Sequence, residues 1–286
     1  MQVRALLGDY PNTAALKSGA LRSERLSFDF VDQPLPQNSF KSVIRGEFDV
    51  AELAIVTYLQ AFAHRKPVRL LPTVVMTIDP HPCIAATAAS GIRKPADLAG
   101  RRVGIRAHSV TTVTWVRGIL ANDFGLDLDR VHWVAFEDQH VPECVEPPNV
   151  SRAPAGKTLA GMLAAGELDA GVVMKKEVDG VRLRHVIDDP EAAAQDWRAR
   201  TGARPMNHVM VVHERLAREQ PWVGEVVQGL LAQSKAAMTM PMPLAGADNL
   251  VSGIDAMRPS LELITRYAWQ QGLIPRCFAV DELFSM

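Results

Sequence analysis

Short apolar runs alternate along the chain with segments in which apolar residues recur at helical spacing. In residues 94–125 this pattern predicts a buried strand at 101–106 (RRVGIR), followed by a loop and a helix. Ser109 is placed to cap that helix and Gly125 to end it. The apolar stripe of the helix consists of Val113, Val116, Ile119, Leu120 and Phe124. The order of strand, loop and helix predicts an α/β protein.

Two segments that lie 120 residues apart share one pattern. VIRGEFDVAEL (43–53) and LAAGELDAGVV (163–173) each read as a helix end, Gly, Glu, an apolar residue, Asp and an apolar strand. Gly46 and Gly166 are predicted to make the left-handed turn that ends a helix. One copy in each half of the chain predicts two pseudo-symmetric lobes.

Chain length also favours two lobes, since 286 residues suit two cores of about 100 to 150 residues better than one. The Pro-rich, polar stretch 137–156 is predicted to be a loop or lid segment. Residues 1–84 and 205–286 are predicted to form a discontinuous first lobe, and residues 85–204 the second. Each lobe is expected to hold a mixed, mostly parallel sheet flanked by helices, with a ligand cleft between the lobes.

Composition and charge exclude several classes of protein. The apolar fraction of 48% and the charged fraction of 22% are typical of a globular chain. Because the net charge is only −1, no global field would hold nucleic acid or a membrane surface, so neither is an expected partner. No apolar run approaches the roughly 18 residues of a membrane span. Cys83, Cys144 and Cys277 are expected to be reduced thiols with a packing role.

The amino-terminal residues read directly into a strand, without the pattern of a signal peptide. We therefore expect a cytoplasmic protein, or a periplasmic one if a signal peptide has been removed.

Several blocks, taken in order, carry a family resemblance. They are DYPNTAALKSG, EFDVAEL with TYL, GIRKPADLAGRRVGI leading into TTVTWVRGILANDFGL, RPMNHVMVV with EQPW, and RYAWQQGLIPR with DELF. In these blocks the chain resembles the 4,5-dihydroxyphthalate decarboxylase family, a branch of the periplasmic (solute-)binding protein type II fold, nearly from end to end. The resemblance implies a cytoplasmic carboxy-lyase of aromatic compound degradation. Such an enzyme removes one carboxylate from a hydroxylated aromatic dicarboxylate by protonating the ring.

Candidate ligand contacts follow from the rule that ligands in open α/β sheets lie beyond the carboxyl ends of the strands. Ser109, Thr111 and Thr112 stand at a predicted helix start, whose amides and hydroxyls favour an anion. Arginine and histidine next to them would add charge-assisted bonds. The predicted ligand-binding residues are Arg106, His108, Ser109, Thr111, Thr112 and Arg117. Alternatively, Ser109 only caps the helix, and Arg106 and Arg117 are surface residues.

Three further residues are candidates for proton transfer, namely Glu52, His81 and His208. Loss of carbon dioxide from a hydroxylated ring needs a proton on the carbon that bears the carboxylate, and a histidine can deliver it. Glu52 closes the strand FDVAEL, where burial would require a partner. The alternatives are core packing for the two histidines and a structural ion pair for Glu52.

Cofactor motifs are absent from the sequence, which holds no GxGxxG fingerprint, P-loop or pyridoxal-type lysine motif. No cofactor is therefore expected, although Glu52, His81 and His208 would suit a divalent metal if the fold brings them together. The expected partner is a small anionic aromatic ligand, and a homo-oligomer is compatible with the sequence. Two other functions stay open: an ABC-transporter-type solute-binding protein without catalysis, and a different enzyme of this fold, such as those of menaquinone synthesis.

Overall fold

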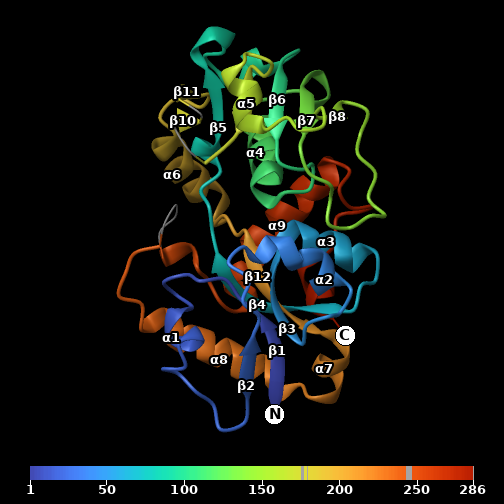
Figure 1. Ribbon diagram of the computed structural model, residues 1–286, viewed down its shortest axis with the longest axis vertical. Coiled ribbons are helices and arrows are strands. Elements are labelled where there is room, and N and C mark those ends of the chain that lie inside the picture. Colours follow the sequence, from blue (N-terminus) through green and yellow to red (C-terminus); the bar gives the residue numbers. More distant parts are fainter. Residues whose placement is uncertain (175–176, 179, 243–246, 286) are drawn as a thin grey trace. The chain divides into compact units, whose positions relative to one another are not determined.

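The computed structural model of the chain describes residues 1–174, 177–178, 180–242 and 247–285 (Figure 1). The chain divides into two compact units. Unit 1 comprises Met1–Ile78, Arg204–Thr265 and Ile274–Met286, and unit 2 comprises Asp79–Ala203 and Arg266–Leu273. The chain crosses between the units after Ile78 and after Ala203, whereas the sequence proposed crossings after residues 84 and 204. The segment Arg266–Leu273 lies in unit 2, although the sequence suggested the first lobe for it.

Unit 1 is built on a five-stranded sheet of order β2-β1-β3-β12-β4. Its strands are β1 (Gln2–Leu6), β2 (Ser27–Phe30), β3 (Val50–Ala54), β4 (Val68–Met76) and β12 (His208–His213). β1 pairs in parallel with β2 and β3, whereas β12 runs antiparallel to both β3 and β4. The carboxyl ends of β1, β3 and β4 and the amino end of β12 therefore share one edge of the sheet.

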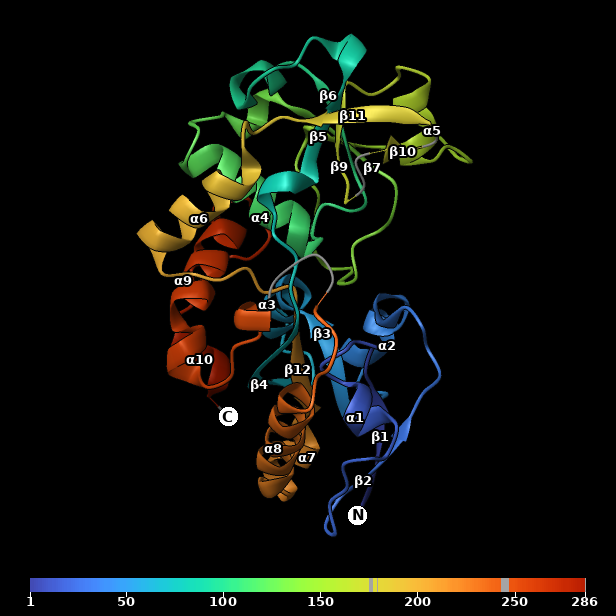
Figure 2. The same ribbon diagram turned by 90° about the vertical axis from the view of Figure 1, so that its left-hand side faces the viewer.

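Helices cover this sheet (Figure 2). They are α1 (Ala14–Lys17), α2 (Phe40–Ile44), α3 (Ile55–Ala63), α7 (Glu214–Glu219), α8 (Trp222–Ala236), α10 (Val280–Phe284), the unit 1 part of α9 (Ile254–Gln270), and the 3-10 turns η1 (Pro36–Ser39) and η6 (Ala247–Asn249). In one core cluster of unit 1, Val223 and Val227 of α8 pack with Val50 of β3 and with Met210 and Val212 of β12. One face of the sheet is thus sealed by α8.

Unit 2 holds a seven-stranded sheet of order β10-β11-β5-β9-β6-β7-β8. Its strands are β5 (Ile84–Thr87), β6 (Arg102–Ile105), β7 (His132–Ala135), β8 (Val150–Arg152), β9 (Ala170–Val172), β10 (Glu177–Val178) and β11 (Val181–His185). The helices are α4 (Thr111–Asn122), α5 (Leu159–Ala164) and α6 (Pro190–Thr201), with 3-10 turns η2 (His81–Cys83), η3 (Ala88–Ser90), η4 (Pro95–Leu98) and η5 (Leu128–Arg130).

The predicted mixed sheets flanked by helices are confirmed in both units. Among the strands given above, antiparallel pairs are as frequent as parallel ones, so the sheets are less parallel than the sequence suggested. The reason is that β12 and β5, the strands next to the crossings, run against their neighbours. The predicted strand 101–106 and the helix after it correspond to β6 and α4.

Two details of that helix differ from the prediction. Its amino-terminal cap is Val110, which makes no side-chain capping bond, so Ser109 is not the cap. Phe124 lies beyond Asn122, the last residue of α4, and is 40% exposed, so it is not part of the buried stripe.

The repeated sequence pattern has the same structure in both units. Gly46 and Gly166 adopt positive φ angles of 81° and 69°. In unit 1 the Asp49 carboxylate accepts a 2.9 Å bond from the Arg4 amide of the neighbouring strand. In unit 2 Asp169 accepts a bond of the same length from the Arg102 amide. This explains the spacing of the pattern, since each aspartate ties its strand to the next one in the sheet.

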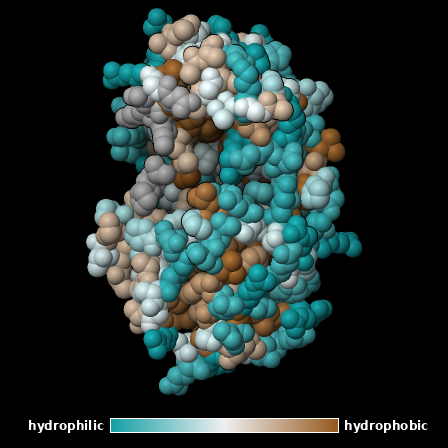
Figure 3. Space-filling view, viewed as in Figure 1, coloured by the Kyte–Doolittle hydropathy of each residue, from teal (hydrophilic) through white to brown (hydrophobic). Residues whose placement is uncertain are grey.

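Within the part of the chain that is described, no helix is long and apolar enough to span a membrane. On the face seen in Figure 3, apolar side chains lie in small groups between hydrophilic ones. The three cysteines are free, as expected. Cys83 is buried, but Cys277 is exposed, so the predicted packing role is wrong for Cys277.

Candidate functional site

A carboxylate is fully buried at the carboxyl end of β3. Strand alternation places Glu52 on the same face as Val50, where the apolar core of unit 1 approaches the edge of the sheet. Its Oε2 accepts a 2.7 Å bond from the Gly8 amide, and its Oε1 accepts a 2.6 Å bond from the Tyr10 hydroxyl. Oε1 also accepts a hydrogen bond from Nδ1 of His208. An ionised carboxylate has lone pairs for all three donors, which offsets the cost of burying its charge.

His208 is the first residue of β12 and lies on the same face as Glu52. The antiparallel ladder sets His208 opposite Ala54, so that its ring reaches Glu52 diagonally across the two strands. Phe40 of α2 meets the imidazole edge to face, at 5.2 Å between ring centroids. Because Nδ1 faces a carboxylate that only accepts, Nδ1 carries the proton in the neutral ring. Within the described residues, Nε2 makes no hydrogen bond, which leaves that nitrogen to exchange protons.

Asn207 fixes the position of this histidine. Its side-chain Oδ1 accepts a 2.6 Å bond from the Ile78 amide, just after β4. Its backbone carbonyl accepts a bond from the Ile55 amide, and its own amide donates to the Met76 carbonyl. The start of β12 is therefore tied to the ends of both neighbouring strands, β3 and β4.

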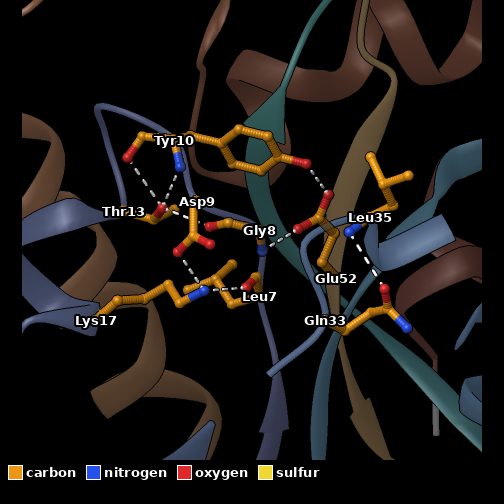
Figure 4. A network of polar contacts seen from close by, with 9 residues as sticks. All are labelled: Leu7, Gly8, Asp9, Tyr10, Thr13, Lys17, Gln33, Leu35 and Glu52. Atoms are coloured by element: carbon orange, nitrogen blue, oxygen red, sulfur yellow. Dashed lines mark hydrogen bonds and ion pairs between the residues drawn. The ribbon is translucent and has the colours of Figure 1, made fainter. Parts of the chain in front are cut away.

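The loop after β1 brings Tyr10 to the carboxylate (Figure 4). The Tyr10 ring lies where a side chain at Gly8 would be, since a Cβ built there falls 2.5 Å from the ring Cζ. The Thr13 hydroxyl accepts from the Tyr10 amide at 3.0 Å and donates to the Gly8 carbonyl at 2.7 Å. Only glycine at position 8 is compatible with this arrangement.

The same loop crosses the edge of the sheet. Lys17 of α1 donates to the Leu7 carbonyl at 2.8 Å and forms an ion pair with Asp9 at 2.5 Å. At the other end, the side-chain amide of Asn12 donates to the Val75 carbonyl of β4. Residues 8–13 thus extend from β1 to β4 over the strands that carry Glu52 and His208.

The phenol of Tyr10 stays protonated in this setting. Burial, together with the negative charge of Glu52, raises the pKa of Tyr10 well above its ordinary value of 10.0. Tyr10 therefore acts as a constant hydrogen-bond donor to the carboxylate across the physiological pH range.

His81 lies in unit 2 and its described contacts are made there. It is 2% exposed in η2, and Trp197 meets its ring edge to face at 5.7 Å. Burial, and then the positive charges of Arg198 and Arg200, lower the pKa of His81 to about 4. The ring is neutral at physiological pH and is packed in the core of unit 2.

His108 and Arg117 are buried together beside α4. The Arg117 guanidinium lies 2.6 Å from His108 Nδ1 and donates to the His108 carbonyl at 2.6 Å. Burial lowers the pKa of Arg117, and burial followed by the Arg117 charge lowers the pKa of His108 to about 2. The alternative of a surface position for Arg117 is therefore wrong. Among the described residues, Arg117 has no acidic partner.

The other predicted ligand contacts form one continuous segment at the end of β6. Arg106 is partly exposed and faces the Glu137 carboxylate at 3.7 Å. Ser109, Thr111 and Thr112 are buried around the first turn of α4. The fold thus gathers all six predicted ligand contacts in unit 2, while Glu52 and His208 meet in unit 1.

The described residues form no metal site. Among them, no cluster of three or more His, Cys, Asp or Glu side chains could hold a metal ion. In place of the hypothetical ligand set of Glu52, His81 and His208, the first and last of these residues bind each other.

Gly8 and Tyr10 belong to the site but were not selected from the sequence. The rule of carboxyl strand ends applies equally to the first strand, QVRAL, and points to the GDYPNT loop that follows it. Applied there, it would have singled out both residues.

Comparison with known proteins supports the resemblance expected from the sequence. A family model described as NMT1/THI5 like matches residues 11–148. The chain is 25% identical over 300 residues to a 4,5-dihydroxyphthalate decarboxylase of Comamonas testosteroni, covering 100% of this chain and 91% of the relative. A protein of the same name from Pseudomonas putida is 29% identical over 203 residues, covering 67% of this chain and 79% of the relative. The predicted resemblance is confirmed.

Solved structures confirm the predicted fold. The alkanesulfonate-binding protein SsuA from Xanthomonas axonopodis pv. citri, bound to MOPS, has a TM-score of 0.64 at 16% identity, covering 99% of this chain and 97% of that one. The periplasmic aliphatic sulphonate binding protein SsuA from Escherichia coli has a TM-score of 0.60 at 13% identity, with coverages of 99% and 97%. The desulfurization enzyme DSZB has a TM-score of 0.56 at 16% identity, with coverages of 99% and 96%. The fold is thus that of periplasmic binding proteins, and it is found in an enzyme as well.

Proposed function

We propose that the protein is a carboxy-lyase that removes one carboxylate from a hydroxylated aromatic dicarboxylate such as 4,5-dihydroxyphthalate. The similarity to two decarboxylases supports this reaction class. The observation that carries the proposal is the buried Glu52–His208 pair, in which Nδ1 is held by the carboxylate and Nε2 makes no bond within the described residues. Such a pair suits a histidine that transfers protons.

The proposed reaction uses the doubly protonated His208 as the general acid. Its Nε2 proton goes to the ring carbon that bears the carboxylate, helped by electron density from a ring hydroxyl ortho or para to that carbon. The bond to the carboxylate then breaks, its electron pair restores the aromatic ring, and carbon dioxide leaves. The neutral imidazole regains a proton from water. One proton is consumed for each carbon dioxide released.

Glu52 is assigned a supporting part in this reaction. Both of its oxygens are occupied by donors within unit 1, so it is poorly placed to accept a proton from the substrate. Its negative charge stabilises the imidazolium and holds Nε2 in a fixed direction. This replaces the direct proton transfer suggested for Glu52 from the sequence.

For the anionic groups of the ligand we retain the segment from Arg106 to Thr112 of unit 2. The first turn of α4 offers backbone amides, and the buried Arg117 adds a positive charge that no described carboxylate neutralises. In this proposal Arg106, His108, Ser109, Thr111, Thr112 and Arg117 bind or orient a carboxylate. We propose the cytoplasm as the compartment, in line with the family resemblance, and cell fractionation tests it.

The second candidate function is that of a solute-binding protein without catalysis, which the fold shared with SsuA favours. Incubation with a panel of hydroxylated aromatic dicarboxylates separates the two. Carbon dioxide release, together with a ligand-induced rise in melting temperature, is expected from the decarboxylase. A rise in melting temperature without any release would refute the enzyme and favour the binding protein.

A further inference from the structure

Two donors share one oxygen of the buried carboxylate. The Tyr10 hydroxyl and Nδ1 of His208 both bind Oε1 of Glu52, while Oε2 is left to the Gly8 amide. A donor that binds an oxygen withdraws negative charge from it, so each of the two weakens the attraction of Oε1 for the other. Tyr10 therefore weakens the hydrogen bond between Glu52 and His208.

We propose that Tyr10 is a positioning residue that sets how tightly Glu52 holds the charged form of His208, and that Gly8 makes room for it. The proposal rests on the proposed function, because it assigns the moderated histidine to proton transfer. Without the Tyr10 hydroxyl, the whole negative charge of Oε1 would face Nδ1. The imidazolium would then be held more strongly and would give up its Nε2 proton less readily.

The loop geometry indicates that Tyr10 is held in place for this contact. Its backbone amide is bound by the Thr13 hydroxyl, and its ring occupies the space above Gly8 (Figure 4). Lys17 secures the preceding residues through the Leu7 carbonyl and Asp9. Since burial raises the pKa of Tyr10 well above its ordinary value, its hydroxyl donates to Oε1 across the physiological pH range.

The direct test is nitrogen-15 NMR of the histidine rings, with the His208 signals assigned by their loss in His208→Gln. In the neutral wild-type ring the proton is expected on Nδ1, with Nε2 free. In Tyr10→Phe the pH midpoint of the His208 titration is expected to rise by about half to one unit, as for the loss of one hydrogen bond. An unchanged midpoint in Tyr10→Phe would overturn the proposal.

The matched control is Tyr58→Phe. Tyr58 is another tyrosine of unit 1, and its buried hydroxyl donates one 2.6 Å bond to the Leu283 carbonyl. This variant also loses a buried hydroxyl, but its His208 midpoint is expected to equal that of the wild type. A shift of similar size in both variants would mean that general loosening of unit 1 is responsible, which would refute the specific role of Tyr10.

Gly8→Ala is expected to remove the hydrogen bond from Tyr10 to Glu52 without changing Tyr10 itself. The added Cβ would lie 2.5 Å from the Tyr10 ring, so the ring must leave its place. Its His208 midpoint is expected to shift in the same direction as in Tyr10→Phe. A midpoint equal to that of the wild type would contradict the spacing role of Gly8, and if Gly8→Ala does not fold, Tyr10→Phe still decides the main question.

Kinetics separate this inference from the proposed function. In Tyr10→Phe, kcat for carbon dioxide release is expected to fall about threefold to tenfold, with KM changed less than about twofold. A raised KM with kcat unchanged would overturn the positioning role. If the wild type releases no carbon dioxide, the proposed function fails, while the NMR titrations still decide whether Tyr10 moderates the pair.

Discussion

Replacing Glu52 by glutamine tests whether the buried carboxylate organises the edge of the sheet in unit 1. The side chain keeps its shape, but one oxygen becomes an NH₂ group. Whichever way the amide turns, this NH₂ group faces at least one of the three donors on Gly8, Tyr10 and His208.

The cost follows from these contacts. A hydrogen bond to a charged group contributes about 1.5 to 3 kcal/mol, and a buried donor left without a partner costs about 1 to 3 kcal/mol. The two effects overlap, so we expect Glu52→Gln to destabilise unit 1 by about 2 to 4 kcal/mol.

Amide hydrogen exchange followed by mass spectrometry measures this loss locally. Exchange in β3 and β12 is expected to become about 30 to 700 times faster, since 1.4 kcal/mol corresponds to a factor of ten. Exchange in β6 of unit 2 should not change. Glu47→Gln is the control, because Glu47 is partly exposed and paired only with Arg45 among its described ion-pair partners. If β3 exchanges equally slowly in Glu52→Gln and Glu47→Gln, the claim that Glu52 stabilises this edge of the sheet is refuted.

Three other expectations concern unit 2. The pKa of His81 is about 4 and that of His108 about 2 in the folded state, against 6.5 for an ordinary histidine, so the unfolded state binds more protons. Stability should therefore fall as the pH drops from 6.5 towards 4, which urea unfolding followed by tryptophan fluorescence at pH 7 and 4.5 measures; equal stabilities would contradict it. In Gly118→Ala the new Cβ would lie 2.0 Å from Tyr267, and urea unfolding should show a loss of about 1 to 3 kcal/mol. Arg106→Gln should raise KM about fivefold with kcat nearly unchanged, and an unaltered KM would remove Arg106 from the ligand site.

Local sequence signals account for what could be predicted. The strand, loop and helix from β6 to α4 follow from apolar spacing and glycine positions within about 30 residues. The two Gly-Glu-x-Asp segments were recognisable because each aspartate secures a neighbouring strand by the same bond. Glu52 and His208 could be chosen singly, as polar residues at the ends of apolar strands.

What the sequence could not provide depends on contacts between distant segments. The pairing of Glu52 with Tyr10 and His208 requires β3 to lie between β1 and β12, an order that periodicity does not encode. Arg117 was predicted to bind ligand, and a surface position was its alternative because the residue lies off the apolar stripe. In the fold α4 is surrounded on nearly every side, so even its polar residues are buried. One of the surrounding segments is 266–273, whose Tyr267 packs on Trp115 of α4.

The most direct test of the central claim is carbon dioxide release from 4,5-dihydroxyphthalate by the wild type and by His208→Gln. The wild type is expected to release carbon dioxide, and the variant to do so at least about 100 times more slowly, as is usual for the loss of a general acid. Both should show the same ligand-induced rise in melting temperature. No release by the wild type, or undiminished release by His208→Gln, would contradict the claim that the Glu52–His208 pair performs a decarboxylation.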